Sequence, residues 1–218
     1  MVRQDQPGVS VEQLDCEGMH NSPVGKIYFD DAKAEEIVVS SSQVKKAVKQ
    51  AFQAERLGIG FVSTGIVEYH LEKLIHYLRN RKVGGAKIIK HQYLQKRLTD
   101  IKIQSETLKA LINCTMQALT RKEDISALAS KIKVLAIRQV IEFAEQAIKC
   151  YGSYGVQQEV GLMRLMSDSL CASIAGGTEE IHRNVIFSKM VRANVNYQQS
   201  KQLDKKIIER IQVLKEAV

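Results

Sequence analysis

Apolar residues recur every three or four positions over most of the chain, a pattern that predicts amphipathic helices rather than alternating strands. In the first long segment the residues with this spacing are Val44, Val48, Phe52, Leu71, Leu74 and Leu78. Ser40 followed by Gln43 fits a capping box at its start, and the Gly84-Gly85 pair is expected to end it, because glycine readily adopts the left-handed conformation common after a helix. The segment therefore predicts one helix of about ten turns.

Four further helices are predicted in the same way. An apolar stripe from about Gln92 to Leu119 predicts the second. The run from about Ile125 to Cys150 is unusually apolar, as expected for a helix that is contacted on several sides. Residues Val160 to Ile174 predict a fourth helix, and Thr178 can cap a fifth, whose acidic first turn opposes the positive end of the helix dipole.

The two ends of the chain have a different character. Residues 1–39 contain short β-leaning runs between glycine and proline residues and predict two or three strands. So few strands cannot bury both faces, so they must dock on the helices, dock on a partner or belong to a larger sheet. Residues 197–218 show a short apolar seam and predict an amphipathic helical tail. The predicted fold is all-α, an antiparallel four-helix-type bundle of long helices over residues 40–196 with a small N-terminal β appendage.

The charge pattern narrows the range of partners. A formal net charge of +8 would suit nucleic acid, a membrane surface or a nucleotide cofactor. The basic side chains are spread among helix positions without the basic stripe and interleaved aromatics of a nucleic-acid binder, which favours solvated helix faces. No segment reaches the ~20 apolar residues of a membrane span, and Met1 to Pro7 lacks a signal-peptide pattern. We therefore expect a cytoplasmic protein without nucleic-acid or membrane partners.

Sequence motifs of known catalytic sites are absent from the chain, including the phosphate-binding loop and the zinc-protease helix. The cysteines lie far apart in the sequence, at Cys16, Cys114, Cys150 and Cys171. The cysteines therefore lack the paired spacing of zinc ligands. The five histidines occur singly and are interpreted as surface or core residues. No metal site is predicted.

Two glycine clusters between predicted helices are the better candidates for a binding site. Tyr151 to Gly155 and Ile174 to Arg183 each lead out of one helix toward the next. Such turns expose backbone N–H groups that suit a phosphate or the edge of a flavin. On spacing alone they can equally be tight turns between helices.

Read together with the segments before them, these clusters resemble the acyl-CoA dehydrogenase family. The agreement in order and spacing extends from about Pro7 to Arg192. The matching segments are Pro7-Gly8-Val9 with Gly25 to Asp31, Ala54-Glu55-Arg56-Leu57, Tyr77 to Gly85, His91-Gln92, Tyr151 to Gly155 and Gly177-Thr178 to Arg183. The resemblance implies FAD as cofactor and an acyl thioester of CoA or of a carrier protein as substrate. A carboxylate then removes the α-proton while the β-hydrogen leaves as hydride.

The resemblance also implies roles for individual residues. Many members carry the catalytic base where this chain has Gly176, and glycine cannot accept a proton. Another branch carries it on the long helix at the position of Glu55, which is therefore the candidate base; its alternative is a solvated glutamate beside Arg56. The implied cofactor contacts, several of them to a flavin bound mainly by a neighbouring subunit, are Arg81, Gln92, Gly152, Thr178 and Glu180.

The departures from the family leave two functions open. The family's N-terminal helical domain and most of its central β-domain have no counterpart in the sequence, and residues 1–39 resemble only the last strands of that β-domain. The chain can be a component or truncated form of an acyl-CoA dehydrogenase that needs an N-terminal dehydrogenase fragment as partner. Alternatively it is a non-catalytic helical module for oligomerisation or interaction. In both cases the family implies a homo-oligomer, usually a dimer of dimers.

Overall fold

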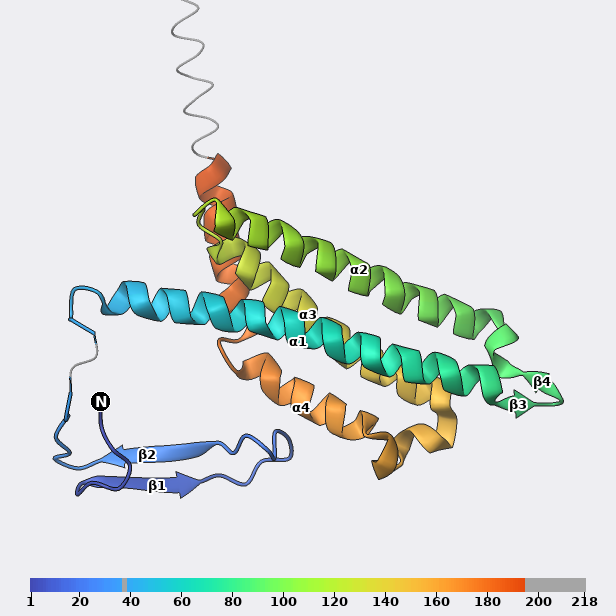
Figure 1. Ribbon diagram of the computed structural model, residues 1–218, viewed down its shortest axis with the longest axis horizontal. Coiled ribbons are helices and arrows are strands. Elements are labelled where there is room, and N and C mark those ends of the chain that lie inside the picture. Colours follow the sequence, from blue (N-terminus) through green and yellow to red (C-terminus); the bar gives the residue numbers. More distant parts are fainter. Residues whose placement is uncertain (37–38, 195–218) are drawn as a thin grey trace, which may run out of the picture.

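The computed structural model describes residues 1–36 and 39–194 and is a bundle of long helices. Its α-helices are α1 (Val44–Asn80), α2 (Gln92–Thr120), α3 (Ser126–Tyr151) and α4 (Leu162–Ile174), and residues 179–194 are also helical. Helix α3 packs against α1, α2 and α4, so it lies at the centre of the bundle (Figure 1). No helix in this part of the chain has the length and apolar character needed to cross a membrane. The predicted helical bundle with a small β appendage is confirmed.

The β appendage is a single antiparallel hairpin of β1 (Val9–Gln13) and β2 (Gly25–Phe29). Val9 pairs with Phe29 and Val11 with Ile27, so these four side chains share one face of the hairpin because strand side chains alternate. Three of the four are exposed, Val11, Ile27 and Phe29. This apolar face of the hairpin is not covered by the described part of the chain.

The loop between the two strands attaches the hairpin to the bundle. The Met19 backbone N–H donates to Asp168 Oδ1 at 2.5 Å, and Ser167 Oγ donates to the Glu17 carbonyl at 2.7 Å. Asp168, which accepts the first bond, and Ser167, which donates the second, both belong to α4. The hairpin therefore docks through its loop, whereas its strands project beside the helices (Figure 1).

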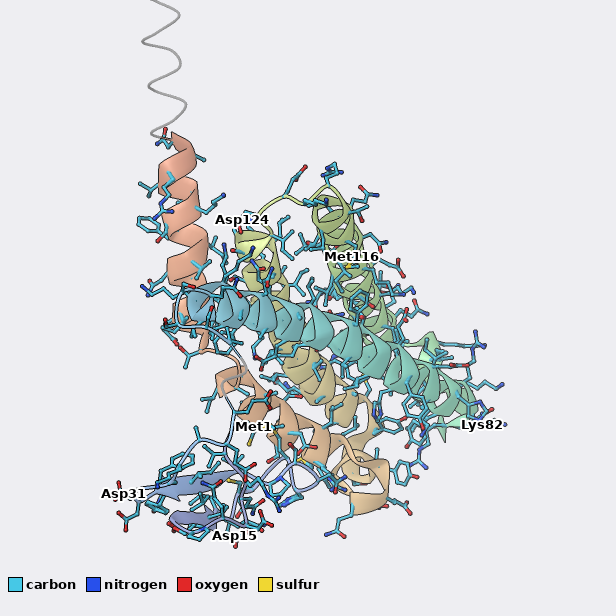
Figure 2. The ribbon with its side chains drawn as sticks, turned by 60° about the vertical axis from the view of Figure 1, so that its left-hand side comes forward. Met1, Asp15, Asp31, Lys82, Met116 and Asp124 are labelled. Atoms are coloured by element: carbon cyan, nitrogen blue, oxygen red, sulfur yellow. The ribbon has the colours of Figure 1, made fainter. Side chains whose placement is uncertain are left out.

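Both ends of α1 differ from the prediction. The helix begins at Val44 with Gln43 as N-cap, and no side chain caps it, so Ser40 is not the capping residue. It ends at Asn80, before the glycine pair. Gly84 and Gly85 have φ of +58° and +82° and form the turn of a small hairpin between β3 (Lys82–Val83) and β4 (Ala86–Lys87). The two consecutive positive φ angles are what a two-residue hairpin turn requires, and this hairpin lies at the Lys82 end of the molecule (Figure 2).

The connections between helices contain short 3₁₀ turns. Residues Ile88–Lys90 form η1 before α2, while Gly152–Val156 and Gln158–Val160 form η2 and η3 between α3 and α4. The fourth helix consequently begins at Leu162 rather than at Val160.

The core of the bundle consists of two apolar clusters separated by a polar layer. One cluster includes Leu74 and Phe143, and the other includes Ile112 and Ile132. The layer between them comprises the buried residues Ser63, Thr64, Ser105 and Gln139. The Ser105 hydroxyl and the Gln139 side-chain amide have no hydrogen-bond partner among the described residues. Buried polar groups are normally paired, so this layer weakens the packing between the two clusters.

Helices α1 and α3 approach closely at Gly60. A Cβ atom at this position would lie 2.4 Å from Ile132 Cγ2, well inside van der Waals contact. Glycine therefore sets the separation of the two helices here, one turn beyond Glu55 on α1.

The helical residues 179–194 are fastened to the bundle near Asp124, at the opposite end from Lys82 (Figure 2). The Asp124 carboxylate accepts hydrogen bonds from Lys49 at 3.1 Å and Lys189 at 3.4 Å. The Ser126 hydroxyl, together with Lys49, holds the pKa of Asp124 well below its usual range. The amphipathic tail predicted for residues 197–218 lies outside the described residues.

Candidate functional site

A groove of about 580 Å³ opens between α1, α4 and the loop that joins β1 to β2. Its walls are mainly apolar and include Ile59 and Val62 of α1 and Leu165 of α4. Two carboxylates line it, Glu55 and Asp168. Asp168 accepts the hydrogen bond that holds the loop, whereas Glu55 makes no hydrogen bond or ion pair with any residue in the ranges 1–36 and 39–194. Glu55 is thus the carboxylate available for chemistry in this groove.

The Glu55 carboxylate lies directly against Gly176. A Cβ atom at Gly176 would be 2.6 Å from Glu55 Oε1 and 3.1 Å from Oε2. Gly176 has φ of +66°, a conformation that glycine adopts without strain. The carboxylate therefore occupies the space that a side chain at position 176 would fill. The two positions that the resemblance offers for a catalytic base are neighbours in space, although they are far apart in the sequence.

A buried lysine lies beneath the turn formed by residues 175–177. Lys133 of α3 is only 2% exposed, and its Nζ donates to the carbonyls of Ala172 at 2.6 Å and Ala175 at 2.7 Å. Burial lowers the pKa of Lys133, while the negative charge of Glu55 acts in the opposite direction. The ammonium is thus bound to the C-terminal end of α4, where helix carbonyls otherwise lack partners.

A buried histidine holds the other side of the same turn. His182 is fully buried, and its Nε2 lies 3.0 Å from the Gly177 carbonyl oxygen. A carbonyl can only accept a hydrogen bond, so Nε2 carries the proton and Nδ1 faces the Ser130 hydroxyl at 3.5 Å. Burial and the nearby Arg56 lower the pKa of His182. Both effects favour the neutral imidazole.

Arg56 completes a group of basic residues around the turn. Its Nε is buried without a hydrogen-bond partner among the described residues, and burial lowers the pKa of its guanidinium. The charge of Glu55 opposes this shift. Arg56 lies near Lys133 and His182, and Glu55 supplies a negative charge close to Arg56 and Lys133. We call Glu55, the groove, the turn 175–177 and these three basic residues the Glu55 region.

A second candidate region lies at the other end of α1. It is a hollow of about 480 Å³, which we call the tyrosine hollow. The residues that line it include Tyr77, Arg81, Lys149, Tyr151 and Tyr154. The rings of Tyr77 and Tyr154 are stacked, with centroids 5.6 Å apart and an interplanar angle of 15°. The Tyr77 and Tyr151 centroids are 4.6 Å apart. Aromatic faces next to two cations suit a ligand that combines a flat ring with an anionic group.

The structure divides the sequence-predicted cofactor residues between these two regions. Arg81 and Gly152 both line the tyrosine hollow. Thr178 and Glu180 lie beside the turn 175–177, where the Thr178 hydroxyl lowers the pKa of Glu180 through a hydrogen bond. Gln92, the first residue of α2, is exposed and does not line the hollow.

The two regions are too far apart to contact one small molecule within one chain. Glu55 and the last residue of α1, Asn80, are separated by 25 helical positions. At 1.5 Å per residue this is roughly 38 Å along the helix axis. An extended dinucleotide is shorter than this distance.

Sequence reasoning did not identify Lys133 and His182. A signal was present for the lysine, because Lys133 lies between Ile132 and Val134 in the strongly apolar helix α3, and a buried ammonium needs acceptors. His182 was interpreted only as a surface or core histidine. Within the described residues, no group of three or more His, Cys, Asp or Glu side chains could hold a metal ion.

Comparison with known proteins gives a consistent family match. Residues 45–191 match the model of the acyl-CoA dehydrogenase C-terminal domain. A 3-sulfinopropanoyl-CoA desulfinase from Paraburkholderia xenovorans is 24% identical over 92% of this chain and 53% of its own length. A cyclohexane-1-carbonyl-CoA dehydrogenase from Geobacter metallireducens is also 24% identical, over 88% of this chain and 51% of its own.

The fold is likewise shared with solved structures. A butyryl-CoA dehydrogenase from Megasphaera elsdenii superimposes with a TM-score of 0.80 at 23% identity, over 87% of this chain and 50% of that chain. At this identity the likeness establishes the fold alone. The chain spans about half the length of the curated relatives it matches.

Proposed function

The chain belongs to the acyl-CoA dehydrogenase family, and from this premise we propose that it supplies the helical half of an FAD-dependent acyl-CoA dehydrogenase site in which Glu55 is the base. One observation carries the proposal. The Glu55 carboxylate rests in the space that a side chain at Gly176 would fill and lines an apolar groove. A carboxylate at that point can take the place of a base at either position, because positions 55 and 176 adjoin in this chain.

The chemistry follows from the groove and its carboxylate. The apolar walls bury an acyl chain, which is favourable in water. Glu55 accepts the α-proton of the thioester and becomes a neutral carboxylic acid. FAD, when bound, supplies the acceptor for the β-hydrogen, which leaves as hydride. The thioester can be on CoA or on a carrier protein, because the groove side chains recognise the acyl chain rather than the carrier.

Glu55 needs a cover that this chain does not provide in the described ranges. Its side chain is exposed along the groove, whereas a carboxylate is a stronger base in water-poor surroundings. The open apolar face of the β1–β2 hairpin needs a cover as well. We propose that the family's N-terminal domain and the rest of its β-domain cover both Glu55 and the apolar face of the hairpin. Residues 1–39 would form the last strands of that β-domain. An N-terminal dehydrogenase fragment added as a second chain can supply these missing parts and would form a hetero-oligomer.

The tyrosine hollow fits one end of FAD. The stacked tyrosine rings suit the adenine, and the Arg81 guanidinium can donate two directed hydrogen bonds to the pyrophosphate. Gly152 exposes backbone beside them. Gln92, although outside the hollow, stays a proposed contact from the start of α2.

The separation of the two regions supports a homo-oligomer. Thr178 and Glu180 follow the turn that Glu55 contacts, and Glu55 is roughly 38 Å along α1 from the hollow, so one chain cannot use both regions on one flavin. Each flavin therefore lies between the Glu55 region of one copy and the tyrosine hollow of another. A dimer, or a dimer of dimers, satisfies this arrangement.

A non-catalytic module is the second candidate. The exposure of Glu55 favours it, as does Gly176, which lacks the carboxylate that many family members carry at this position. In that case the groove and the apolar face serve only to hold a partner protein.

Co-production of the chain with an N-terminal dehydrogenase fragment tests the proposal. We expect a yellow complex whose flavin absorbance is bleached anaerobically by an acyl-CoA. Glu55→Gln should keep the flavin but lose bleaching by roughly 10²-fold or more, the scale of a general base. Glu72→Gln, at another exposed glutamate of α1, is the matched control and should bleach normally.

A colourless complex would contradict the flavin site. A yellow complex in which Glu55→Gln bleaches at the normal rate would contradict the role of Glu55. A stable but colourless assembly with the fragment would favour the non-catalytic module.

A further inference from the structure

We propose that Lys133 and His182 form a clamp that fixes the turn 175–177 and thereby positions the Glu55 carboxylate. The inference rests on the proposed role of Glu55 as the base. Both residues are positioning residues, because they touch the turn rather than the groove that takes the acyl chain.

The lysine side of the clamp joins α3 to the end of α4. Lys133 Nζ reaches the carbonyls of Ala172 and Ala175 at 2.6 and 2.7 Å. An ammonium is strongly disfavoured in the core unless it is hydrogen-bonded, and Lys133 is only 2% exposed. The two bonds therefore determine where the lysine lies and, in return, where the last turn of α4 ends.

The histidine side of the clamp holds the residue after Gly176. His182 donates through Nε2 to the Gly177 carbonyl at 3.0 Å, from the first turns of the helical residues 179–194. Gly176 is consequently bracketed by two anchored carbonyls, those of Ala175 and Gly177. Consecutive glycines have the greatest backbone freedom of any residues, so without these anchors the turn would sample many conformations.

The clamp acts on Glu55 through the surface of Gly176. The carboxylate rests where a Cβ of Gly176 would be, so the position of the turn limits the rotamers open to Glu55. Glu55 makes no hydrogen bond to any other described residue, so this contact and the charges of Lys133 and Arg56 are the restraints on its carboxylate. A displaced turn would leave the base free to swing along the groove.

NMR relaxation of the full chain measures the clamp directly. In the wild type the N–H vectors of Gly176 and Gly177 should show order parameters of about 0.85, and in Lys133→Met they should fall below about 0.6. Lys131→Met is the matched control, since Lys131 is an exposed lysine on the same helix, and it should leave both order parameters unchanged.

The histidine side has its own pair of variants. His182→Leu removes the donor to the Gly177 carbonyl and should loosen Gly177, whereas His182→Gln retains an N–H donor and should loosen it less. If Lys133→Met does not fold, the order parameters of Gly176 and Gly177 in Lys133→Arg, His182→Leu and His182→Gln test the clamp instead. Unchanged order parameters in the folded variants would overturn the clamp.

Kinetics of the assembled flavin complex separate positioning from mere stability. Lys133→Met should lower kcat by about tenfold or more with KM changed by less than about threefold, and Lys133→Arg should restore part of the loss, as expected for misplacement of a reacting group. Equal kcat in Lys133→Met and wild type would also overturn the clamp. If the wild-type assembly has no dehydrogenase activity but the order parameters respond, the proposed function fails and the clamp on the turn stands.

Discussion

At the Glu55 end of α1 the side chains of Lys133 and His182 are buried and hydrogen-bonded, whereas at the Arg81 end the polar groups are exposed. Lys133 and His182 are 2% and 0% exposed and hold backbone carbonyls. Arg81, Lys149 and Gly152 lie on an open rim beside three tyrosines. In the first region, hydrogen bonds within the chain fix the positions of the polar side chains. In the second region the polar groups are exposed, and a bound molecule would have to fix their positions. Substitutions at the two ends should therefore differ in what they disturb.

The largest expected effect is on the position of Glu55, the proposed base. Gly176→Ala places a Cβ 2.6 Å from Glu55 Oε1, so the flexible carboxylate must move out of the space it occupies. We expect the assembled complex to lose roughly 10²-fold in bleaching rate, the scale of a misplaced reacting group. Stopped-flow absorbance of the flavin checks this.

Gly161→Ala is the matched control for that loss. Gly161 has φ of +74°, and a Cβ at this position would meet nothing within 4 Å, so only the backbone strain is shared with Gly176→Ala. Both variants should lose about 1–2 kcal/mol of unfolding free energy from the left-handed conformation, measured by urea denaturation. Similar rates in the two variants would show that contact with Gly176 does not position Glu55.

The unfolding free energy should depend on pH through buried histidines, one of which lies at the Glu55 end. Burial lowers the pKa of His70 and of His182 in the folded chain, so the unfolded chain binds more protons as the pH falls. Their stabilising contribution is complete above the unfolded pKa of 6.5 and is lost as the pH falls through the folded values. Between pH 7.5 and 5.5 the unfolding free energy should drop by about 1–2 kcal/mol.

The histidine at the Glu55 end should account for part of this loss. His182→Gln should flatten the pH dependence, as followed by urea denaturation at each pH. The tyrosine hollow should contribute nothing in this range, because burial raises the pKa of Tyr151 above its ordinary value of 10.0. A pH dependence that is unaltered in His182→Gln would contradict a buried neutral histidine.

The third prediction concerns the polar layer between the two ends. Gln139 is 5% exposed and its amide has no partner among the described residues, so Gln139→Met removes an unpaired polar group at similar volume. We expect a gain of about 0.5–1 kcal/mol in unfolding free energy, because an unsatisfied buried group is unfavourable. Gln117→Met on the exposed side of α2 should be neutral. A loss of stability in Gln139→Met would indicate that the amide is hydrogen-bonded.

The smallest effect is expected at the open end. Arg81 is exposed, so Arg81→Ala should change the unfolding free energy of the chain by less than about 0.5 kcal/mol. Any loss of flavin from the assembled complex then reports on binding alone. A large loss of stability would show that the hollow is organised by the chain after all.

The local parts of the fold were predictable from the sequence. Apolar spacing marks α1 to α4, because each helix buries one stripe against its neighbours. The start of α1 was predicted wrongly, since Ser40 satisfies a capping pattern that the backbone does not use. Gly84-Gly85 was also misassigned, because glycine pairs serve hairpin turns as readily as helix ends.

The candidate site was less predictable, because its contacts join distant segments. Periodicity does not place Glu55 beside Gly176, and only the resemblance linked the two positions. The bonds from Lys133 to Ala172 and Ala175 depend on how α3 and α4 pack, which residue spacing does not specify. Likewise, nothing in the sequence separates Gln92 from Arg81 and Gly152, whereas the fold leaves Gln92 outside their hollow.

The close approach of α1 and α3 at Gly60 has a consequence for how this site can vary. With a Cβ at position 60 only 2.4 Å from Ile132, any larger residue would wedge the two helices apart. Glu55 is carried by one of these helices and Lys133 by the other, so the wedge would draw the carboxylate and the ammonium beneath it away from each other. A residue outside the groove thus governs the geometry of the Glu55 region, and its size limits where the Glu55 carboxylate can lie.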